Sequence, residues 1–170
     1  MKRALAAGLL CASLAHAQPP KGLPEAAPPW SAVGSAKMRW LGLHVYDITL
    51  WSAAPRFDER APHALFIRYA RSISGDALVK ASLDQLRHLG FRDEGQLARW
   101  GRSLAAVFPG VRAGETLLGV HHPGVGAQFF HQGKATGNID DPELARAFFA
   151  IWMDEKTSEP ALRKKLLGTP

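Results

Sequence analysis

Apolar and polar positions alternate along the first part of the chain, which indicates β-strands. Residues 37–51 carry apolar side chains on both alternating sets of positions, as a central strand does, or two strands joined by a bend at Gly42. Residues 63–71 repeat the alternation, with Leu65, Ile67 and Tyr69 on one side. We therefore expect neighbouring strands at the start of the domain, separated by a polar loop over residues 54–62.

After residue 71, the apolar positions repeat with the period of an α-helix. Ser74 can cap a helix running to about Leu89, with Gly90 just past its end. Asp93 can cap a second helix that ends at Pro109. The spacing thus predicts a helix pair immediately after the strands.

Strand and helix patterns follow each other once more before the chain ends. Residues 114–122 predict a strand, residues 123–126 a turn, and residues 127–132 a return strand. Asp141 can cap a third helix with Pro142 at its first position, and Ser158 begins a short fourth helix that stops at Gly168. This order does not alternate as in a parallel α/β fold, so we expect an α+β domain, an antiparallel sheet with helices on one face.

The first residues have the pattern of a secretory signal. Lys2 and Arg3 precede an apolar run over residues 4–14 that is too short to span a bilayer, and Ala15-His16-Ala17 is a small-x-small cleavage site. We expect a signal peptide over residues 1–17, a proline-rich linker over residues 18–32, one domain over residues 33–170, and a periplasmic location. A retained anchor, or lipid attachment at Cys11, fits the segment less well.

Charge and cysteine content narrow the class further. Cys11 is the single cysteine, so the mature chain would have no disulfide and no thiol chemistry. The formal charge of +6 comes from basic residues that do not interleave with aromatic ones, which favours a solvated surface over a nucleic-acid site. Weak attraction to anionic lipid headgroups is the alternative.

Histidines and glycines supply the candidates for a metal or a phosphate site. His121 and His122 are adjacent in a strand and point to opposite faces, and a pair with His131 would lack a third ligand, so we expect ordinary histidines and no metal. The glycines near residue 124 lack the spacing of a phosphate loop, and no cofactor is expected.

Asp47 is a charged residue in an apolar strand. A catalytic carboxylate is one interpretation, and pairing with Arg68 or Arg71 across the sheet is the one we favour. Trp100 and Trp152 fall at helical spacing, where tryptophans more often belong to the core than to a ligand platform.

Four segments together carry a family resemblance. They are residues 34–39 followed by 44–51, residues 71–75, residues 108–111 with Gly114, and residues 140–168, which form the most specific of the four. With them the chain resembles the chalcone-isomerase-like proteins, in their bacterial exported branch. The resemblance implies an open-faced β-sandwich, in which a curved antiparallel sheet is covered on one face by helices and a ligand cleft lies between the two layers.

The plant enzymes of that family cyclise a chalcone with the help of an arginine, a tyrosine, an asparagine and hydroxyl residues. The resemblance places Arg39 at the arginine, Tyr46 at a threonine and Gln85 at the asparagine. Leu78 falls at the tyrosine and Ile151 at a hydroxyl residue, so two polar groups are lost. Loss of one such donor costs roughly 10²–10³ in rate, so no catalytic residue is assigned.

Other members of the family bind fatty acids in the same cleft without catalysis. The resemblance implies that Arg39, Tyr46 and Gln85 would hold the polar end of such a ligand, and that its walls would be Leu78, Phe148, Ile151 and Trp152. We therefore expect a periplasmic binder of a fatty acid or a similar amphipathic acid. The alternatives are an isomerase or lyase that uses Arg39 and Tyr46 on an enone-like substrate, and an envelope interaction protein without a small ligand.

Overall fold

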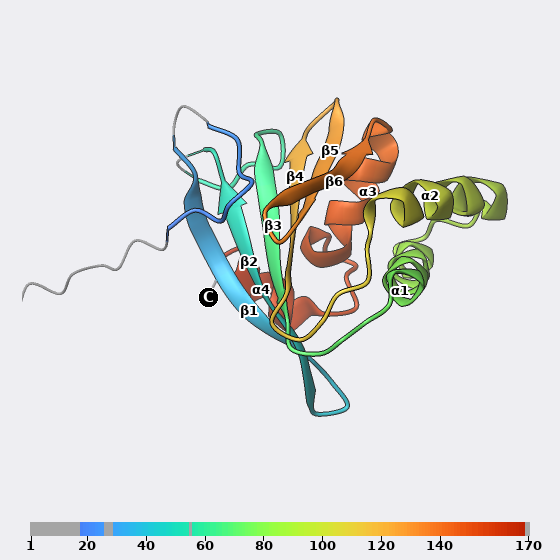
Figure 1. Cartoon of the computed structure of the whole chain (residues 1–170). Coiled ribbons are helices and arrows are strands. Elements are labelled where there is room, and N and C mark those ends of the chain that lie inside the picture. Colours follow the sequence, from blue (N-terminus) through green and yellow to red (C-terminus); the bar gives the residue numbers. More distant parts are fainter. Residues whose placement is uncertain (1–17, 26–28, 55, 169–170) are drawn as a thin grey trace, which may run out of the picture.

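The computed structural model of this chain of 170 residues describes residues 18–25, 29–54 and 56–168 (Figure 1). The predicted signal peptide lies outside the described residues. Within them, the fold is α+β: one antiparallel sheet with the strands in sequence order, and four helices. The strands are β1 (Ser31–Trp40), β2 (Leu43–Ser52), β3 (His63–Tyr69), β4 (Thr116–His122), β5 (Gly126–His131) and β6 (Lys134–Ile139). The helices are α1 (Gly75–His88), α2 (Glu94–Val107), α3 (Pro142–Met153) and α4 (Pro160–Leu166).

The sheet is a simple meander in which each strand pairs with the next one along the chain. The bend expected at Gly42 is the turn of a hairpin, which Leu41 and Gly42 form between β1 and β2. Two strand predictions were incomplete. β1 begins at Ser31 rather than at residue 37, and the half-exposed edge strand β6 was missed because Gly137 and Asn138 weaken its apolar alternation.

Side-chain caps define three of the four helix starts, as the sequence predicted. Ser74 accepts a hydrogen bond from the Ala77 amide, and Asp93 accepts one from the Gln96 amide. Asp141 caps α3 in the same way, because its side chain accepts hydrogen bonds from the amides of the second and third helical residues. The fourth prediction was wrong in detail: α4 begins at Pro160, and the Ser158 hydroxyl donates to the Gln85 side chain instead.

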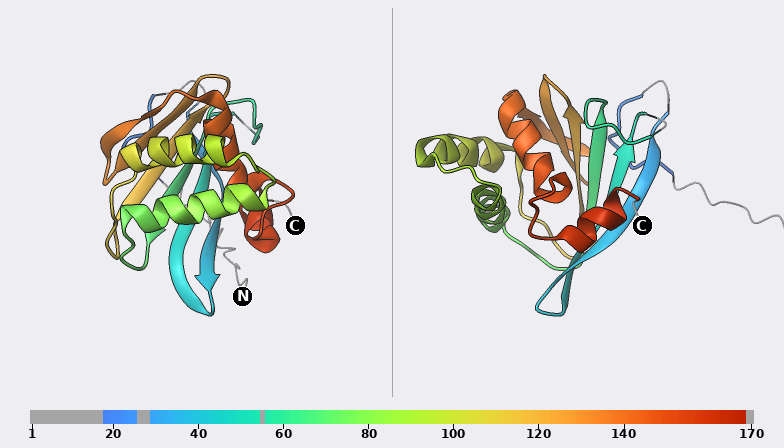
Figure 2. Two further views of the ribbon diagram at one scale, coloured as in Figure 1. Left: turned by 90° about the vertical axis from the view of Figure 1, so that its right-hand side faces the viewer. Right: turned by 180° about the vertical axis from the view of Figure 1, so that it is seen from behind.

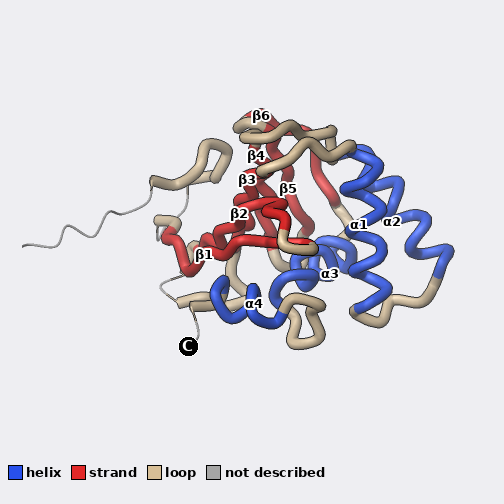
Figure 3. Tube along the Cα trace, turned by 90° about the horizontal axis from the view of Figure 1, so that it is seen from below, coloured by secondary structure: helices blue, strands red, loops and turns tan. Residues whose placement is uncertain are grey.

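The four helices gather on one side of the sheet (Figure 3). Helix α3 packs against β4, β5 and β6, and α2 contacts the edge strand β6. Helix α1 lies further out, against α2 and α3 (Figure 2). The core between the layers combines the inner faces of β2 and β3 with α3, and includes Ile48, Leu50, Leu65, Leu144 and Phe149. Helix α4 lies across β1, where Gly34 allows the closest approach, because a Cβ there would overlap the carbonyl oxygens of Lys165 and Leu166. The cover of helices therefore extends to the first strand.

The outer face of the sheet is covered by the segment that precedes β1. Trp30 and Leu23 pack there on a second apolar cluster that includes Trp51, Leu118 and Val120. The indole Nε1 of Trp30 donates to the carbonyl oxygen of Pro24 at 2.7 Å, a hydrogen bond that links two parts of this segment. Residues 18–32 were expected to be a linker, and their described part adds the buried Trp30 and the partly buried Leu23 to the domain.

No helix within the described ranges is long and apolar enough to cross a membrane.

Candidate functional site

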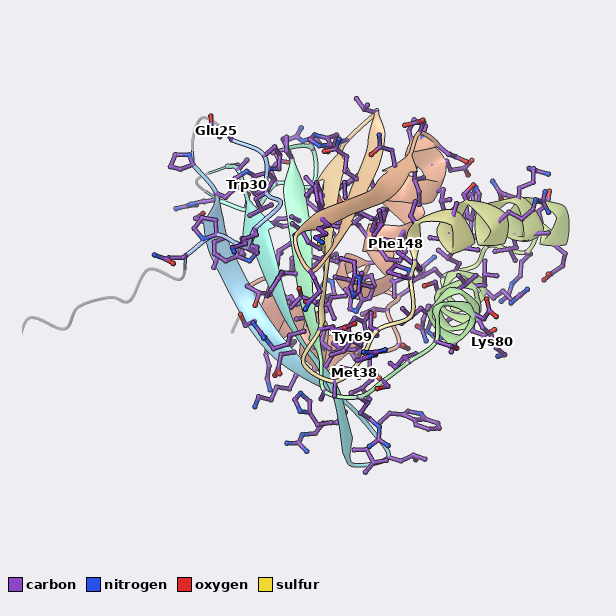
Figure 4. All side chains as sticks on the ribbon, in the orientation of Figure 1. Glu25, Trp30, Met38, Tyr69, Lys80 and Phe148 are labelled. Carbon is purple, nitrogen blue, oxygen red and sulfur yellow. The ribbon has the colours of Figure 1, made fainter. Side chains whose placement is uncertain are left out.

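A cavity of about 590 Å³ separates helix α1 from the inner face of the sheet. Strands β1 to β5 form one wall, while α1 and α3 form the other. The lining is mostly apolar and includes Leu65, Ile67, Leu117, Phe129, Phe148 and Ile151. Figure 4 shows Phe148, Tyr69 and Met38 following one another down the space between the sheet and α1. The cavity therefore runs from the aromatic core toward the base of the β1–β2 hairpin.

Polar groups collect at one end of this cavity. The indole Nε1 of Trp152 donates a hydrogen bond to the hydroxyl of Tyr46 at 2.9 Å. An indole N–H can only donate, so the Tyr46 oxygen accepts and its own hydrogen remains available for a ligand. The ring of Tyr69 stands edge-on to that of Tyr46, with centroids 5.9 Å apart. Two phenol groups thus face the same end of the cavity.

Both tyrosines are held in the neutral form. Burial raises the pKa of Tyr46 to about 12, and the negative charge of Glu159 adds to this effect, although the Trp152 hydrogen bond acts in the opposite direction. Burial also raises the pKa of Tyr69. Near neutral pH each phenol therefore keeps its proton and can act as a hydrogen-bond donor.

Gln85 and Ser158 complete the polar end. The Ser158 hydroxyl donates to Oε1 of Gln85 at 2.7 Å, so the Gln85 amide nitrogen keeps its two donors. Both residues line the cavity, as does Glu159, which precedes α4. Sequence reasoning missed Tyr69, Ser158 and Glu159. The alternation that puts Tyr69 on the same face as Leu65 and Ile67 was the signal that could have found the first of them.

The structure brings together six of the seven residues that the resemblance had placed in the cleft: Tyr46, Leu78, Gln85, Phe148, Ile151 and Trp152 all line the cavity. Ligand binding by these residues stays a prediction. Arg39 is the exception, since Met38 and Trp40 line the cavity and the exposed Arg39 between them points away from it. Its Nη1 lies 3.3 Å from the carbonyl oxygen of Gly42. Arg39 therefore does not belong to the cavity lining, and its part in holding a ligand stays a prediction that this geometry does not support.

The cavity lining carries a negative charge and no positive one among the described residues. Glu159 is its single charged side chain, and no lysine, arginine or histidine belongs to it. A charged carboxylate in this space would have to rely on the phenol and amide donors alone.

The other candidates from the sequence have structural partners of their own. Asp47 lies opposite Arg68 in the β2–β3 register, but its carboxylate forms an ion pair with Lys37 at 3.9 Å and lies 3.3 Å from Nε2 of His44. The expected pairing with an arginine was wrong: of its two register partners, Lys37 on β1 and Arg68 on β3, Asp47 forms its ion pair with Lys37. Trp100 is buried in the core, and its Nε1 donates to Asp141.

The histidines occupy separate environments. His131 lies 2.9 Å from a carboxylate oxygen of Glu115, whereas Nδ1 of His121 lies 3.1 Å from Nε2 of His63 in the buried core. His63 was not anticipated from the sequence, because it pairs with His121 only through the β3–β4 register. Across the described ranges, no three histidine, cysteine, aspartate or glutamate side chains are arranged to hold a metal ion.

Comparison of the sequence and the fold with known proteins identifies the family of this chain. An uncharacterized protein of Haemophilus influenzae is 26% identical over 140 residues, which cover 82% of this chain and 68% of that protein. The solved structure of a fatty-acid binding protein of Arabidopsis thaliana superposes with a TM-score of 0.63 over 87% of this chain and 90% of that one, at 12% identity. The resemblance confirms the expected open, curved antiparallel sheet with its helical cover. The family description "chalcone isomerase-like" matches residues 44–168, so the chain belongs to the chalcone isomerase-like family.

Proposed function

We propose that this protein binds a small amphipathic molecule, such as a fatty acid, in the cavity between the sheet and α1. The observation that carries the proposal is the cavity itself: about 590 Å³ of mostly apolar space with a few convergent polar groups at one end. Small-molecule sites typically have about 300–1,000 Å³ and the same division between apolar walls and few polar groups. The similar fold of a plant fatty-acid binding protein supports the same class of ligand.

The geometry suggests how such a ligand would lie. Its polar end would accept hydrogen bonds from the phenols of Tyr46 and Tyr69 and from the Gln85 amide, and its apolar chain would extend toward Phe129 and Phe148. Each buried methylene group would contribute about 0.8 kcal/mol of transfer free energy. The apolar chain would thus supply most of the affinity, and the polar end would orient the ligand.

The cavity lining contains one acidic residue and no basic one, which supports binding of the ligand's polar end in an uncharged form. A carboxylate that leaves water without a paired cation loses several kcal/mol, which the phenol and amide donors offset only in part. Glu159 adds repulsion between like charges. A fatty acid would therefore enter as the protonated acid, and an alcohol or an amide of the same length would fit equally well.

The same charge balance argues against an enolate-forming isomerase. Such a reaction needs donors or cations that stabilise developing negative charge. Here burial and the charge of Glu159 already raise the pKa of Tyr46, so the site disfavours an additional negative charge. Leu78 and Ile151 contribute no donor to the lining. We therefore propose a binding function without turnover.

The proposal is tested by extracting the purified protein with organic solvent and identifying the released molecules by mass spectrometry. Ala81 lies at an exposed position on α1 and also lines the cavity, so Ala81→Trp should fill its opening. Ala106→Trp on α2 is the matched control, because Ala106 is exposed and does not line the cavity. We expect near-stoichiometric acyl or other amphipathic compounds from the native chain and the control, and few from Ala81→Trp. Equal recovery from all three proteins would contradict the proposal.

We also propose that the chain is exported to the periplasm. The support is the sequence pattern of residues 1–17. Cell fractionation followed by N-terminal sequencing should recover a periplasmic form that begins at Gln18. Recovery of a cytoplasmic form that begins at Met1 would contradict export.

A further inference from the structure

Apolar side chains are concentrated at the tip of the β1–β2 hairpin. The exposed fractions of Trp40, Leu41 and Leu43 are 65%, 82% and 51%, and among the described residues one other large apolar side chain, Val125 at 70%, is comparably exposed. Figure 1 shows that this hairpin extends past the ends of the other strands. A single exposed leucine is ordinary, but three large apolar side chains at one projecting tip call for a physical reason.

The backbone of the turn at this tip is strained, and no burial of the strained residue offsets the cost. Leu41 adopts a φ of 49° and Gly42 a φ of 79°, both in the left-handed region. Asparagine or glycine occupies the first of these positions readily, whereas leucine incurs a steric cost. Leu41 gains no burial in return, because four-fifths of it is exposed. A strained and solvent-exposed leucine is more consistent with an interaction surface than with a folding role.

Basic side chains flank the apolar tip. Arg39 is exposed next to Trp40 and points away from the cavity. Lys37 lies two residues before Arg39 on the same face of β1, and 65% of its side chain is exposed. Both Lys37 and His44 lie close to the carboxylate of Asp47. Apolar side chains at a tip with cations behind them match the layers of an anionic membrane surface, in which the acyl region lies beneath negatively charged headgroups.

We propose that the tip formed by Trp40, Leu41 and Leu43 docks on an anionic lipid bilayer. Leu41 and Leu43 would enter the acyl boundary, Trp40 would lie at the interface, and Arg39 would contact headgroups. The narrow, projecting shape favours a bilayer over a protein, since a stable protein interface needs about 800 Å² from each partner. Trp40 also lines the cavity, so docking would bring the cavity to the membrane surface, from which amphipathic molecules come. The docking itself does not depend on the proposed ligand.

Leu41→Asn is the decisive variant. Asparagine suits the left-handed turn, so the variant should fold as well as the native chain or better, while it removes the most exposed apolar side chain of the tip. Val125→Asn is the matched control, because Val125 is similarly exposed in the β4–β5 turn at the opposite end of the sheet. Binding is measured by co-sedimentation with phosphatidylcholine vesicles that contain about one third phosphatidylglycerol, since anionic lipid supplies the attraction for basic residues.

We expect partitioning onto these vesicles to fall about tenfold for Leu41→Asn and to stay unchanged for Val125→Asn, because insertion of one leucine side chain is worth at least that factor. Thermal melting should show that Leu41→Asn is not less stable than the native chain. The proposal is overturned if the native chain remains in the supernatant, or if both variants lose binding equally. It is also overturned if size-exclusion chromatography shows that the tip instead holds two copies of the chain together and Leu41→Asn separates them.

Discussion

At the residue scale, the hydrogen bond between Trp152 and Tyr46 connects α3 to β2 at the polar end of the cavity. Replacing Tyr46 with phenylalanine keeps the ring and removes the acceptor, so the partly buried indole N–H of Trp152 loses its partner. We expect the free energy of unfolding to fall by about 1–2 kcal/mol. Urea denaturation followed by circular dichroism measures this change.

Tyr69→Phe is the control for that variant. Burial and the nearby Tyr46 raise the pKa of Tyr69, and among the described residues its hydroxyl has no hydrogen-bond partner. Stability should change by less than about 0.5 kcal/mol, because the change removes no hydrogen bond within the protein. A Tyr69→Phe loss as large as that of Tyr46→Phe would contradict the assignment.

The buried histidine pair gives the stability a pH dependence. Nδ1 of His63 faces the carbonyl oxygen of Ala61 and must donate, so Nε2 accepts from Nδ1 of His121. Nε2 of His121 has no hydrogen-bond partner within the described structure, and the His121 ring stacks on the ring of Phe149. Burial lowers the pKa of His121 from 6.5 to about 4, and electrostatic interactions with His63, His122 and Arg146 act in the same direction. Burial also lowers the pKa of His63.

A lowered histidine pKa means that the unfolded chain binds more protons than the folded one at mildly acidic pH. The free energy of unfolding should therefore fall as the pH falls from about 6.5 to 4, by at most about 1.4 kcal/mol per pH unit for each histidine. Melting curves across this range measure the slope. His121→Gln should flatten it, whereas His88→Gln, an exposed change on α1, should leave it intact. An unchanged slope in His121→Gln would assign the effect to other groups.

At the element scale, the contact between β1 and α4 depends on the missing side chain of Gly34. A Cβ there would overlap backbone carbonyl oxygens of α4, and backbone cannot rotate away as a side chain does. We expect Gly34→Ala to lower the free energy of unfolding by roughly 2 kcal/mol or more, because overpacking of this kind forces a helix to shift. Chemical denaturation measures the loss.

Gly101→Ala in α2 is the same substitution in a different setting. Its new Cβ would meet the mobile end of Leu83, and alanine favours a helix over glycine by about 1 kcal/mol. Stability should therefore stay level or rise. If both variants were equally destabilised, the close approach of α4 would not be the cause of the Gly34 effect.

Elements defined by local chemistry were the ones that the sequence predicted well. Ser74, Asp93 and Asp141 cap helices through groups two or three residues away, so a short window contains the whole signal. β6 was missed because its pairing with β5, rather than its own composition, makes it a strand. The sequence did not show that Arg39 lies outside the cavity lining, because a shift of one residue along a strand exchanges its faces, and the face depends on the pairing with β2.

At the scale of the whole molecule, the fold class followed from element order and from the family resemblance, but the charge of the cavity did not. Glu159 and Tyr69 are far apart in the sequence and meet the same cavity only after the sheet and the helices have assembled. Trp40 belongs both to the cavity lining and to the apolar hairpin tip, so the cavity reaches the hairpin that projects from one end of the sheet (Figure 1). The proposed ligand site and the proposed membrane contact therefore share one residue, Trp40.

The charge of the cavity also predicts how an acidic ligand should respond to pH. If dodecanoic acid binds only in its protonated form, its affinity should fall about tenfold for each pH unit above the carboxyl pKa, which lies near 4–5. The affinity for dodecanol, which does not ionise, should stay constant between pH 5.5 and about 8, since the tyrosines keep their protons throughout. Competition against a fluorescent probe in the cavity measures both affinities.

Glu159→Gln separates the two causes of this discrimination. Removing the carboxylate abolishes the repulsion and leaves the desolvation cost, so the affinity for dodecanoate near pH 8 should rise while that for dodecanol stays the same. Asp76→Asn, an exposed change at the start of α1 outside the cavity lining, should alter neither affinity. If native protein binds dodecanoate as tightly at pH 8 as at pH 5.5, a cation must reach the bound carboxylate. The uncharged form would then be the wrong ligand state, while binding in the cavity would stand.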